Sequence, residues 1–189
     1  MLNRIQNNAP VVIGFTLICL FSLLINFLTK GVSNFLVFSI YWTGLLDPLQ
    51  YVRLFTHIFG HQDFSHFFNN IILILLLGPA LEEKYGSKAI ACLIAITAFT
   101  TGILNVVMTS SILLGASGIV FMFIILSSFV NLQKGKIPLT LILVVLIFIG
   151  QEIYAGISIT DNVSNATHIA GGVCGAVLGY FINKKNNKL

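Results

Sequence analysis

The sequence predicts an all-α, polytopic membrane protein, a bundle of six transmembrane helices with a large interfacial first loop. Of its 189 residues, 57% are hydrophobic and only 8% are charged, whereas a soluble domain carries about 25% charged residues. Long apolar runs alternate with short polar links. Because a spanning helix takes roughly 20 residues, the chain has room for about six spans in one domain over residues 1–189.

The composition excludes other classes of protein. Disordered chains combine low hydrophobicity with high net charge, which is the opposite of this balance. Ten Lys and Arg residues face six Asp and Glu residues without forming a basic stripe, so nucleic acid is not an expected partner. Cys19, Cys92 and Cys174 lie in three different apolar runs. We expect them to be buried small apolar side chains rather than disulfide or metal-binding residues.

The first predicted helix covers residues 10–29, around the apolar run from Val11 to Leu28. A signal peptide is the alternative, but no small-x-small cleavage site stands out after the run, which suits a spanning helix better. The other five predicted helices cover residues 64–82, 88–108, 115–132, 137–155 and 166–183.

The segment from Gly31 to Ser65 is apolar and aromatic, but glycines and Pro48 interrupt it and it carries charges such as Asp47 and Arg53. This composition favours an element in the membrane interface, where Trp and Tyr rings lie at headgroup depth.

The basic residues predict the orientation of the chain. Six helices place both termini on one side, and Lys30 and Arg53 on the other. The terminal side would carry Arg4, Lys84, Lys88, Lys134, Lys136, Lys184, Lys185 and Lys188. Since cytoplasmic loops carry an excess of Lys and Arg, we expect both termini in the cytoplasm and the long loop on the outer face.

Polar side chains inside apolar runs are functional candidates, because they are costly in a bilayer. His66 and Asn70 are four residues apart and share one helix face, whereas Asn69 points about 100° away. His57 and His61 have the same spacing, which is compatible with zinc. They fall in an expected irregular loop with no cysteine near them, so we expect no metal site.

Ser117 and His168 are the other candidates. Gly115 and Gly118 flank Ser117, which admits either close helix packing or a nucleophile at a helix N-terminus, where negative charge is favoured. His168 precedes a glycine stripe formed by Gly171, Gly175 and Gly179, so it is either a packing residue or a group facing a close partner helix. Taken together, the residues favour a serine nucleophile with a histidine base, and Asn70, His66 and the Ser117 N–H as oxyanion donors. No acidic residue in an apolar run is placed to orient His168, so the unit would be a dyad.

Several short motifs occur in order between Tyr51 and Tyr180. They are Arg53-x-x-Thr56-x-x-Phe59, His66-x-x-x-Asn70, the turn from Ala80 to Ser87 with Glu82, Gly115-Ala116-Ser117-Gly118, and His168 followed by Ala170-Gly171 and Gly175. In this order and at these spacings, they resemble the motifs of the rhomboid intramembrane serine proteases.

The resemblance implies a rhomboid core over about residues 45–183, with Ser117 as nucleophile, His168 as general base, and Asn70, His66 and the Ser117 N–H as the oxyanion hole. It implies that Gly115, Gly118, Gly171 and Gly175 serve substrate approach and helix packing, and that Arg53 and Glu82 are structural. Its six-helix form is typical of bacterial members, which points to the bacterial inner membrane, and its fifth helix would be the lateral gate.

Four residues depart from the family pattern. Val52 replaces the usual Trp, which affects the packing expected for the first loop. Phe121 replaces a Tyr that supports the histidine ring. Gln151 and Glu152 are polar for a gate helix, and they lie at the outer interface or favour gate opening.

The expected function is therefore an intramembrane serine endopeptidase without a cofactor, which cleaves single-pass transmembrane proteins near their outer membrane boundary. A catalytically silent rhomboid-like protein that binds membrane clients is one alternative. A small transporter or channel is another, although the midplane charges and internal repeat typical of that class are not evident. The physiological substrate and the oligomeric state stay open.

Overall fold

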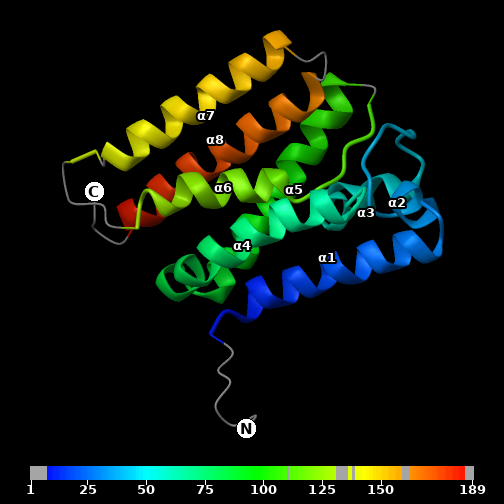
Figure 1. The fold of residues 1–189 in the computed structure, drawn as a ribbon, viewed down its shortest axis with the longest axis horizontal. Helices are drawn as coiled ribbons and strands as arrows, with labels where there is room; N and C mark the ends of the chain where they lie inside the picture. The colour runs from blue at the N-terminus through cyan, green and yellow to red at the C-terminus, as the bar shows by residue number, and fades with distance from the viewer. Residues whose placement is uncertain (1–7, 110, 131–135, 138, 159–161, 186–189) are drawn as a thin grey trace, which may run out of the picture.

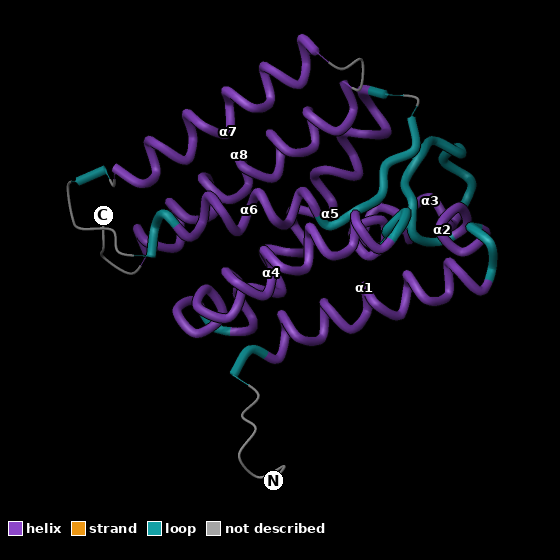
Figure 2. The backbone as a smooth tube through the Cα atoms, in the orientation of Figure 1, coloured by secondary structure: helices purple, strands orange, loops and turns teal. Residues whose placement is uncertain are grey.

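The computed structural model describes residues 8–109, 111–130, 136–137, 139–158 and 162–185 of the chain. These residues form helices and loops, with one isolated antiparallel bridge between Ile40 and Leu113, which confirms the all-α prediction for them. The longest loops gather at one end of the molecule, beside α2 and α3 (Figure 2). The helices are α1 (Pro10–Leu28), α2 (Val32–Leu36), α3 (Pro48–Thr56), the 3₁₀ helix η2 (His57–Phe59), α4 (Phe64–Tyr85), α5 (Ser87–Met108), α6 (Ser117–Ser127), α7 (Leu139–Ser158) and α8 (Asn162–Lys185).

Among the residues that the structure describes, four helices are long and apolar enough to cross a membrane, namely α1, α4, α5 and the part of α8 from Ala166 to Lys184. Helix α6 is apolar but has only 11 residues, which is about 16 Å of helix against a hydrocarbon thickness of about 30 Å. The helix expected over 115–132 is therefore shorter than a span, and α6 begins partway through the bundle.

Helix α6 occupies the centre of the bundle. It packs most closely on α8 and also contacts α4, α5 and α7, whereas α1 packs on α4 (Figure 1). Ile119, Met122, Phe123 and Leu126 are fully buried. A helix that is apolar on every side is typical of a buried core element, and α6 is the helix against which α4, α5, α7 and α8 pack.

The ends of the helices separate into two groups (Figure 1). The beginning of α1, the turn between α4 and α5, the end of α6, the beginning of α7 and the end of α8 lie at one end of the molecule. Lys84, Lys88 and Lys184 belong to these segments, while Lys30 and Arg53 belong to the loop at the opposite end. The basic residues that the structure describes are thus separated as the charge pattern predicts.

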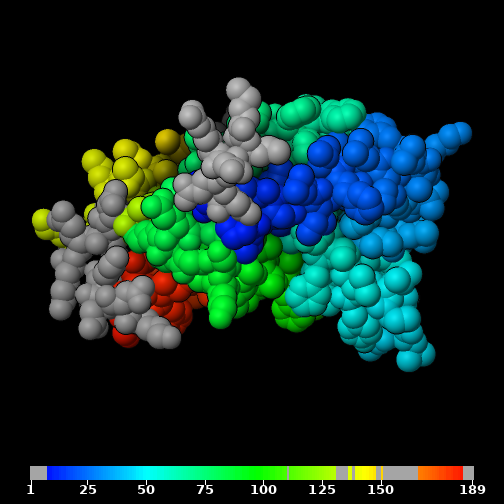
Figure 3. Space-filling view, turned by 90° about the horizontal axis from the view of Figure 1, so that it is seen from below, coloured from blue at the N-terminus to red at the C-terminus, as the bar shows by residue number. Residues whose placement is uncertain are grey.

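The first loop is held together by a buried arginine. Arg53 on α3 is 3% exposed; its Nε donates to the carbonyl oxygen of Leu36 at 2.9 Å, and its Nη1 lies 3.2 Å from the Asp47 carboxylate. The Tyr41 ring lies against its guanidinium. Around this centre the loop forms a lobe at one end of the molecule (Figure 3), with large apolar side chains such as Trp42 and Leu46 exposed.

The prediction that all three cysteines are buried is wrong for one of them. Cys92 is exposed on α5, although Cys19 and Cys174 are buried as expected. Cys92 faces outward because it lies opposite the α5 face that buries Ile90, Leu93 and Ile94. Val52, the position that departs from the Trp pattern, lies at the surface of the loop with an exposed fraction of 44%.

Candidate active site

The chain enters the site through an irregular segment that precedes α6. Leu113 pairs with Ile40 in both directions, its N–H donating at 2.9 Å and its carbonyl oxygen accepting at 2.8 Å. Gly115 donates its N–H to the His57 carbonyl oxygen at 3.0 Å, and the Asn105 side chain donates to the carbonyl oxygen of Ser111 at 3.0 Å. Because these bonds satisfy the backbone without a helix, the segment can run inside the bundle and deliver Ser117 to the first position of α6.

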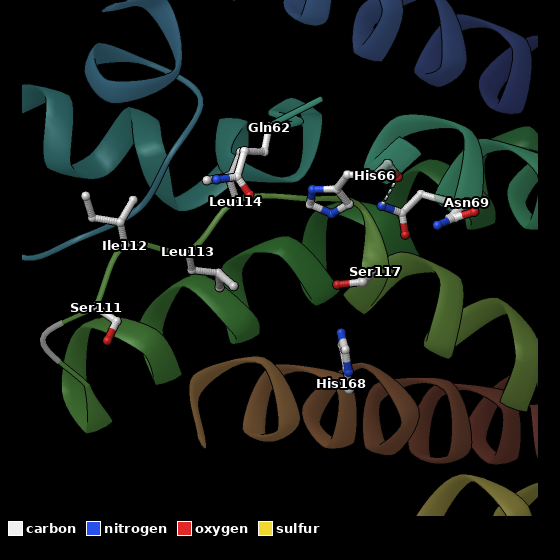
Figure 4. A pocket seen from close by; sticks show the side chains of 10 residues that line it. Gln62, His66, Asn69, Ser111, Ile112, Leu113, Leu114, Ser117 and His168 are labelled. Atoms are coloured by element: carbon white, nitrogen blue, oxygen red, sulfur yellow. Dashed lines mark hydrogen bonds between the residues drawn. The ribbon is translucent and has the colours of Figure 1, made fainter. Parts of the chain in front are cut away.

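Ser117 and His168 line one cavity of about 510 Å³. Figure 4 shows the Ser117 hydroxyl and the His168 ring facing the same space from α6 and α8. The complete lining is Gln62, His66, Asn69, Asn70, Ser111, Ile112, Leu113, Leu114, Ser117 and His168. The structure thus brings together the serine, the histidine and both expected oxyanion donors from α4, and it adds polar groups around them.

The glycines on α8 allow α8 to approach the backbone of α6. A Cβ atom on Gly171 would overlap the carbonyl oxygen of Gly118, and one on Gly175 would lie 2.6 Å from the Met122 carbonyl oxygen. His168 is one turn before Gly171, so this approach carries its ring to the α6 N-terminus. The Phe121 ring, with its centroid 4.5 Å from that of His168, packs against the imidazole.

The α4 side of the cavity is built by the first turns of that helix. Asp63 caps α4 by accepting the His66 N–H at 2.8 Å. Asn70 donates its Nδ2 to the His66 carbonyl oxygen at 3.1 Å. An amide nitrogen carries two hydrogens, so this bond fixes the side chain and leaves one hydrogen for an oxyanion.

Gly115 is required at its position for two reasons. Its φ of +126° is a conformation that residues with a side chain rarely adopt. A Cβ atom there would also lie 2.7 Å from Nε2 of His66. Gly115 therefore gives the His66 ring its space, and its expected role in substrate approach stays a prediction.

Two further histidines in the first loop are buried. His57 donates from Nδ1 to the Arg53 carbonyl oxygen at 3.0 Å, and its Nε2 lies 3.2 Å from the Thr101 hydroxyl. Burial lowers the pKa of His57 to about 4, and burial together with the nearby His66 lowers the pKa of His61 to about 4. Both side chains are therefore neutral at pH 7. Within the described residues, no group of three His, Cys, Asp or Glu side chains is placed to hold a metal ion.

A second, much smaller cavity lies beside Ser117. Its volume is about 10 Å³, which is room for about one water molecule. His57, Thr101 and Thr167 contribute its polar side chains, together with Ser117. The sequence placed His57 in the loop but gave no signal that it reaches the nucleophile.

Several functional contacts were not predicted from the sequence. Asn69, expected to point away from Asn70, also lines the large cavity, as do Gln62 and Ser111. Adjacent residues on a helix can both reach a wide cavity, so an angle of about 100° does not exclude either. Glu82 was expected to hold its own turn, and its carboxylate does bond the Ser87 side chain there. It also accepts the N–H groups of Val11 and Val12 at 3.0 and 2.9 Å, a contact that the sequence did not predict.

The polar pair Gln151 and Glu152 lies in α7, but the side chains of both are outside what the structure describes. Their expected position at the outer interface, or influence on a gate, stays a prediction.

Comparisons with known proteins identify the family. The rhomboid domain model matches residues 48–185. RHOMBOID-like protein 1 of Arabidopsis thaliana is 27% identical over 150 residues, covering 71% of this chain and 38% of the relative. Rhomboid protease GlpG of Salmonella newport is 28% identical over 137 residues, covering 68% of this chain and 47% of the relative. The chain thus matches less than half the length of these relatives. Since the domain match covers most of the chain and includes all the helices around the cavity, this protein belongs to the rhomboid family of multi-pass membrane proteins.

Proposed function

We propose that the protein is an intramembrane serine endopeptidase of the rhomboid type. The observation that carries the proposal is the shared cavity, into which Ser117, His168, Asn70 and His66 project from three different helices. A nucleophile, a base and oxyanion donors in one polar cavity are the requirements of acyl transfer. The relative named a rhomboid protease supports the same activity.

The reaction begins when the Ser117 oxygen attacks the carbonyl carbon of a substrate peptide bond, while His168 takes the hydroxyl proton. The resulting oxyanion accepts hydrogen bonds from the Asn70 amide, the His66 ring and the Ser117 N–H. His168 then gives its proton to the leaving amine as the carbon–nitrogen bond breaks. A water molecule, deprotonated by His168, hydrolyses the acyl-enzyme and restores the Ser117 hydroxyl.

The position of Ser117 supports a substrate that comes from the membrane. The short α6 begins inside the bundle, so a soluble loop would have to enter deeply to reach it. A transmembrane helix must lose its internal hydrogen bonds before its backbone can bind in the cavity. We expect cleavage of single-pass proteins near the outer membrane boundary, where small or helix-breaking residues make unwinding less costly.

We further propose six spans, made by α6 and α7 together with the four candidate spans α1, α4, α5 and α8. Both termini would lie in the cytoplasm, and the cavity would open to the outer face. Helix α7 packs on α8 and α6 at the edge of the bundle, which supports its role as the lateral gate. The separation of the described lysines from the first loop supports this orientation.

The test is cleavage of a tagged single-pass substrate by the purified protein in detergent, with Ser117→Ala and His168→Ala as parallel samples. We expect one cut near the outer boundary for the wild type and none for either variant, with Asn70→Ala slower by about 10²–10³-fold, the usual cost of one oxyanion donor. Labelling of Ser117 by a fluorophosphonate gives an independent readout of the nucleophile. If folded wild type neither cleaves a panel of substrates nor is labelled, the protein is a silent client-binding member of the family.

A further inference from the structure

His61 is a fully buried histidine that the proposed chemistry does not use. It follows η2 and lies between the first loop and α4. Its exposed fraction is 0%, and its Nδ1 donates to the Phe59 carbonyl oxygen at 3.1 Å. Its own carbonyl oxygen accepts from the Asn34 side chain at 2.9 Å. These bonds tie both the ring and the backbone of His61 to the loop.

The ring of His61 packs against two aromatic rings of α4. Its centroid is 5.1 Å from that of His66 in an edge-to-face arrangement, and 5.4 Å from that of Phe67. Edge-to-face pairs have a preferred geometry, so a ring fixed in the loop restricts the orientation of the ring that it meets. Phe67 is itself buried, which holds His61 from a second direction.

One ring nitrogen of His61 has no hydrogen-bond partner within the described part of the chain, so a role in stability alone does not explain why a histidine stands at this position. Because Nδ1 donates to a carbonyl oxygen, Nε2 carries the lone pair, and this atom is buried without a hydrogen-bond partner among the described residues. An unsatisfied buried acceptor costs free energy, and such a group calls for a specific reason. The ring of His61 is therefore not optimised for stability alone, and its contact with His66 is the feature that bears on the cavity.

His66 needs external support, because an oxyanion donor acts only if it is already in place. The Nε2–Cε1 edge of its ring faces Gly115, where even one added carbon would clash. His61 contacts the same ring from the first loop. On that side the ring has room only because Gly115 lacks a side chain, and on the loop side it meets the ring of His61.

We propose that His61 is a positioning residue that holds the His66 ring in the orientation needed in the oxyanion hole, an inference that rests on the proposed protease function. The ring of His61 acts through His66 and touches no substrate. Loss of the ring slows the chemical step and leaves substrate binding unchanged, because the support matters most when the oxyanion forms. The first loop thereby takes part in catalysis through a side-chain contact.

The experiment is a double-mutant cycle with His61→Ala, His66→Ala and the double variant, measured as kcat and KM on a single-pass substrate. Concentrations are taken from fluorophosphonate titration of Ser117, so that misfolded enzyme is not counted. His61→Phe keeps a ring without the Nδ1 donor, and His61→Asn keeps a donor without the ring. Ile90→Ala is the control for general destabilisation, because Ile90 is fully buried and lies in the first turn of α5, outside the lining of the cavity.

We expect His61→Ala to lower kcat by about 10- to 100-fold with KM unchanged, as misplacement of a reacting group does. The double variant should equal His66→Ala, His61→Phe should recover most of kcat, and Ile90→Ala should lower thermal stability alone. Additive losses in the double variant, or recovery by Asn and not by Phe, would overturn the positioning role while leaving the protease proposal intact. A wild type that neither cleaves nor labels overturns both.

Discussion

Substitution of Gly171 by alanine tests whether the approach of α8 to α6 sets the catalytic geometry. The added Cβ would overlap the carbonyl oxygen of Gly118 and lie 2.9 Å from its carbonyl carbon and 3.0 Å from its Cα. These are backbone atoms, which cannot rotate away as the end of a side chain can. Carbon atoms rest at about 3.5–4.0 Å from one another, so the two helices must separate by roughly half to one ångström.

This separation acts directly on the dyad. Gly118 follows Ser117, and Gly171 is one turn after His168, so the distance between the two reacting groups grows with the distance between the helices. A displacement of 1 Å can cost about 10²-fold in rate, and overpacking costs about 1–3 kcal/mol of stability. We expect Gly171→Ala to lower kcat by one to two orders of magnitude, with a lower melting temperature and a folded bundle.

The assay is the initial rate of cleavage in one detergent, with the active fraction titrated at Ser117. The matched control is Gly14→Ala on α1, where a Cβ atom would meet nothing within 4 Å and where alanine favours the helix by about 1 kcal/mol. A folded Gly171→Ala enzyme with kcat within threefold of wild type would refute the reasoning, because it would mean that the dyad tolerates separation of α6 and α8.

Two further predictions concern stability. Glu82→Gln should lower the free energy of unfolding by about 1–3 kcal/mol, since Val11 and Val12 donate to different oxygens of the carboxylate and the amide replaces one of these acceptors with an NH₂ donor. In thermal unfolding the exposed neighbour variant Glu83→Gln should match wild type, and equal melting temperatures for the two variants would contradict the capping role. Burial lowers the pKa of His57 to about 4, below the usual 6.5 of an unfolded chain, so His57 takes up a proton on unfolding between these two pH values. The free energy of unfolding therefore falls as the pH drops from 6.5 to 4, by at most about 3 kcal/mol from this residue. Melting temperatures of wild type and His57→Gln across that window measure the effect, which is absent if both fall with the same slope.

The sequence predicted most helices because hydropathy reports burial and exposure to lipid along a whole segment. It could not predict where α6 begins. The run from Ile112 to Leu132 is mostly apolar, yet Leu113 pairs as an extended residue with Ile40 and the helix starts at Ser117. A short apolar stretch has the same composition whether it is extended chain or helix, so periodicity does not distinguish them.

The functional side chains were predictable to the extent that local spacing reports their position. His66 and Asn70 share a helix face by their four-residue separation, and the structure places both at the cavity. The link from Glu82 to the first helix was beyond such reasoning, because these partners are backbone groups about seventy residues earlier. The first N–H groups of any helix need an acceptor, but the sequence does not show which side chain the fold brings to them.

A serine nucleophile inside a membrane bundle needs more than a histidine beside it. The helix that carries it must begin at depth, and the segment before that helix then has backbone groups without helical partners, which are costly away from water. Here protein groups satisfy them: Ile40 pairs with Leu113, His57 accepts from Gly115, and Asn105 donates to Ser111. Two of these partners come from the first loop. The backbone of the first loop therefore lowers the free-energy cost of the non-helical segment before α6. This allows α6 to begin at Ser117 and places Ser117 beside the cavity.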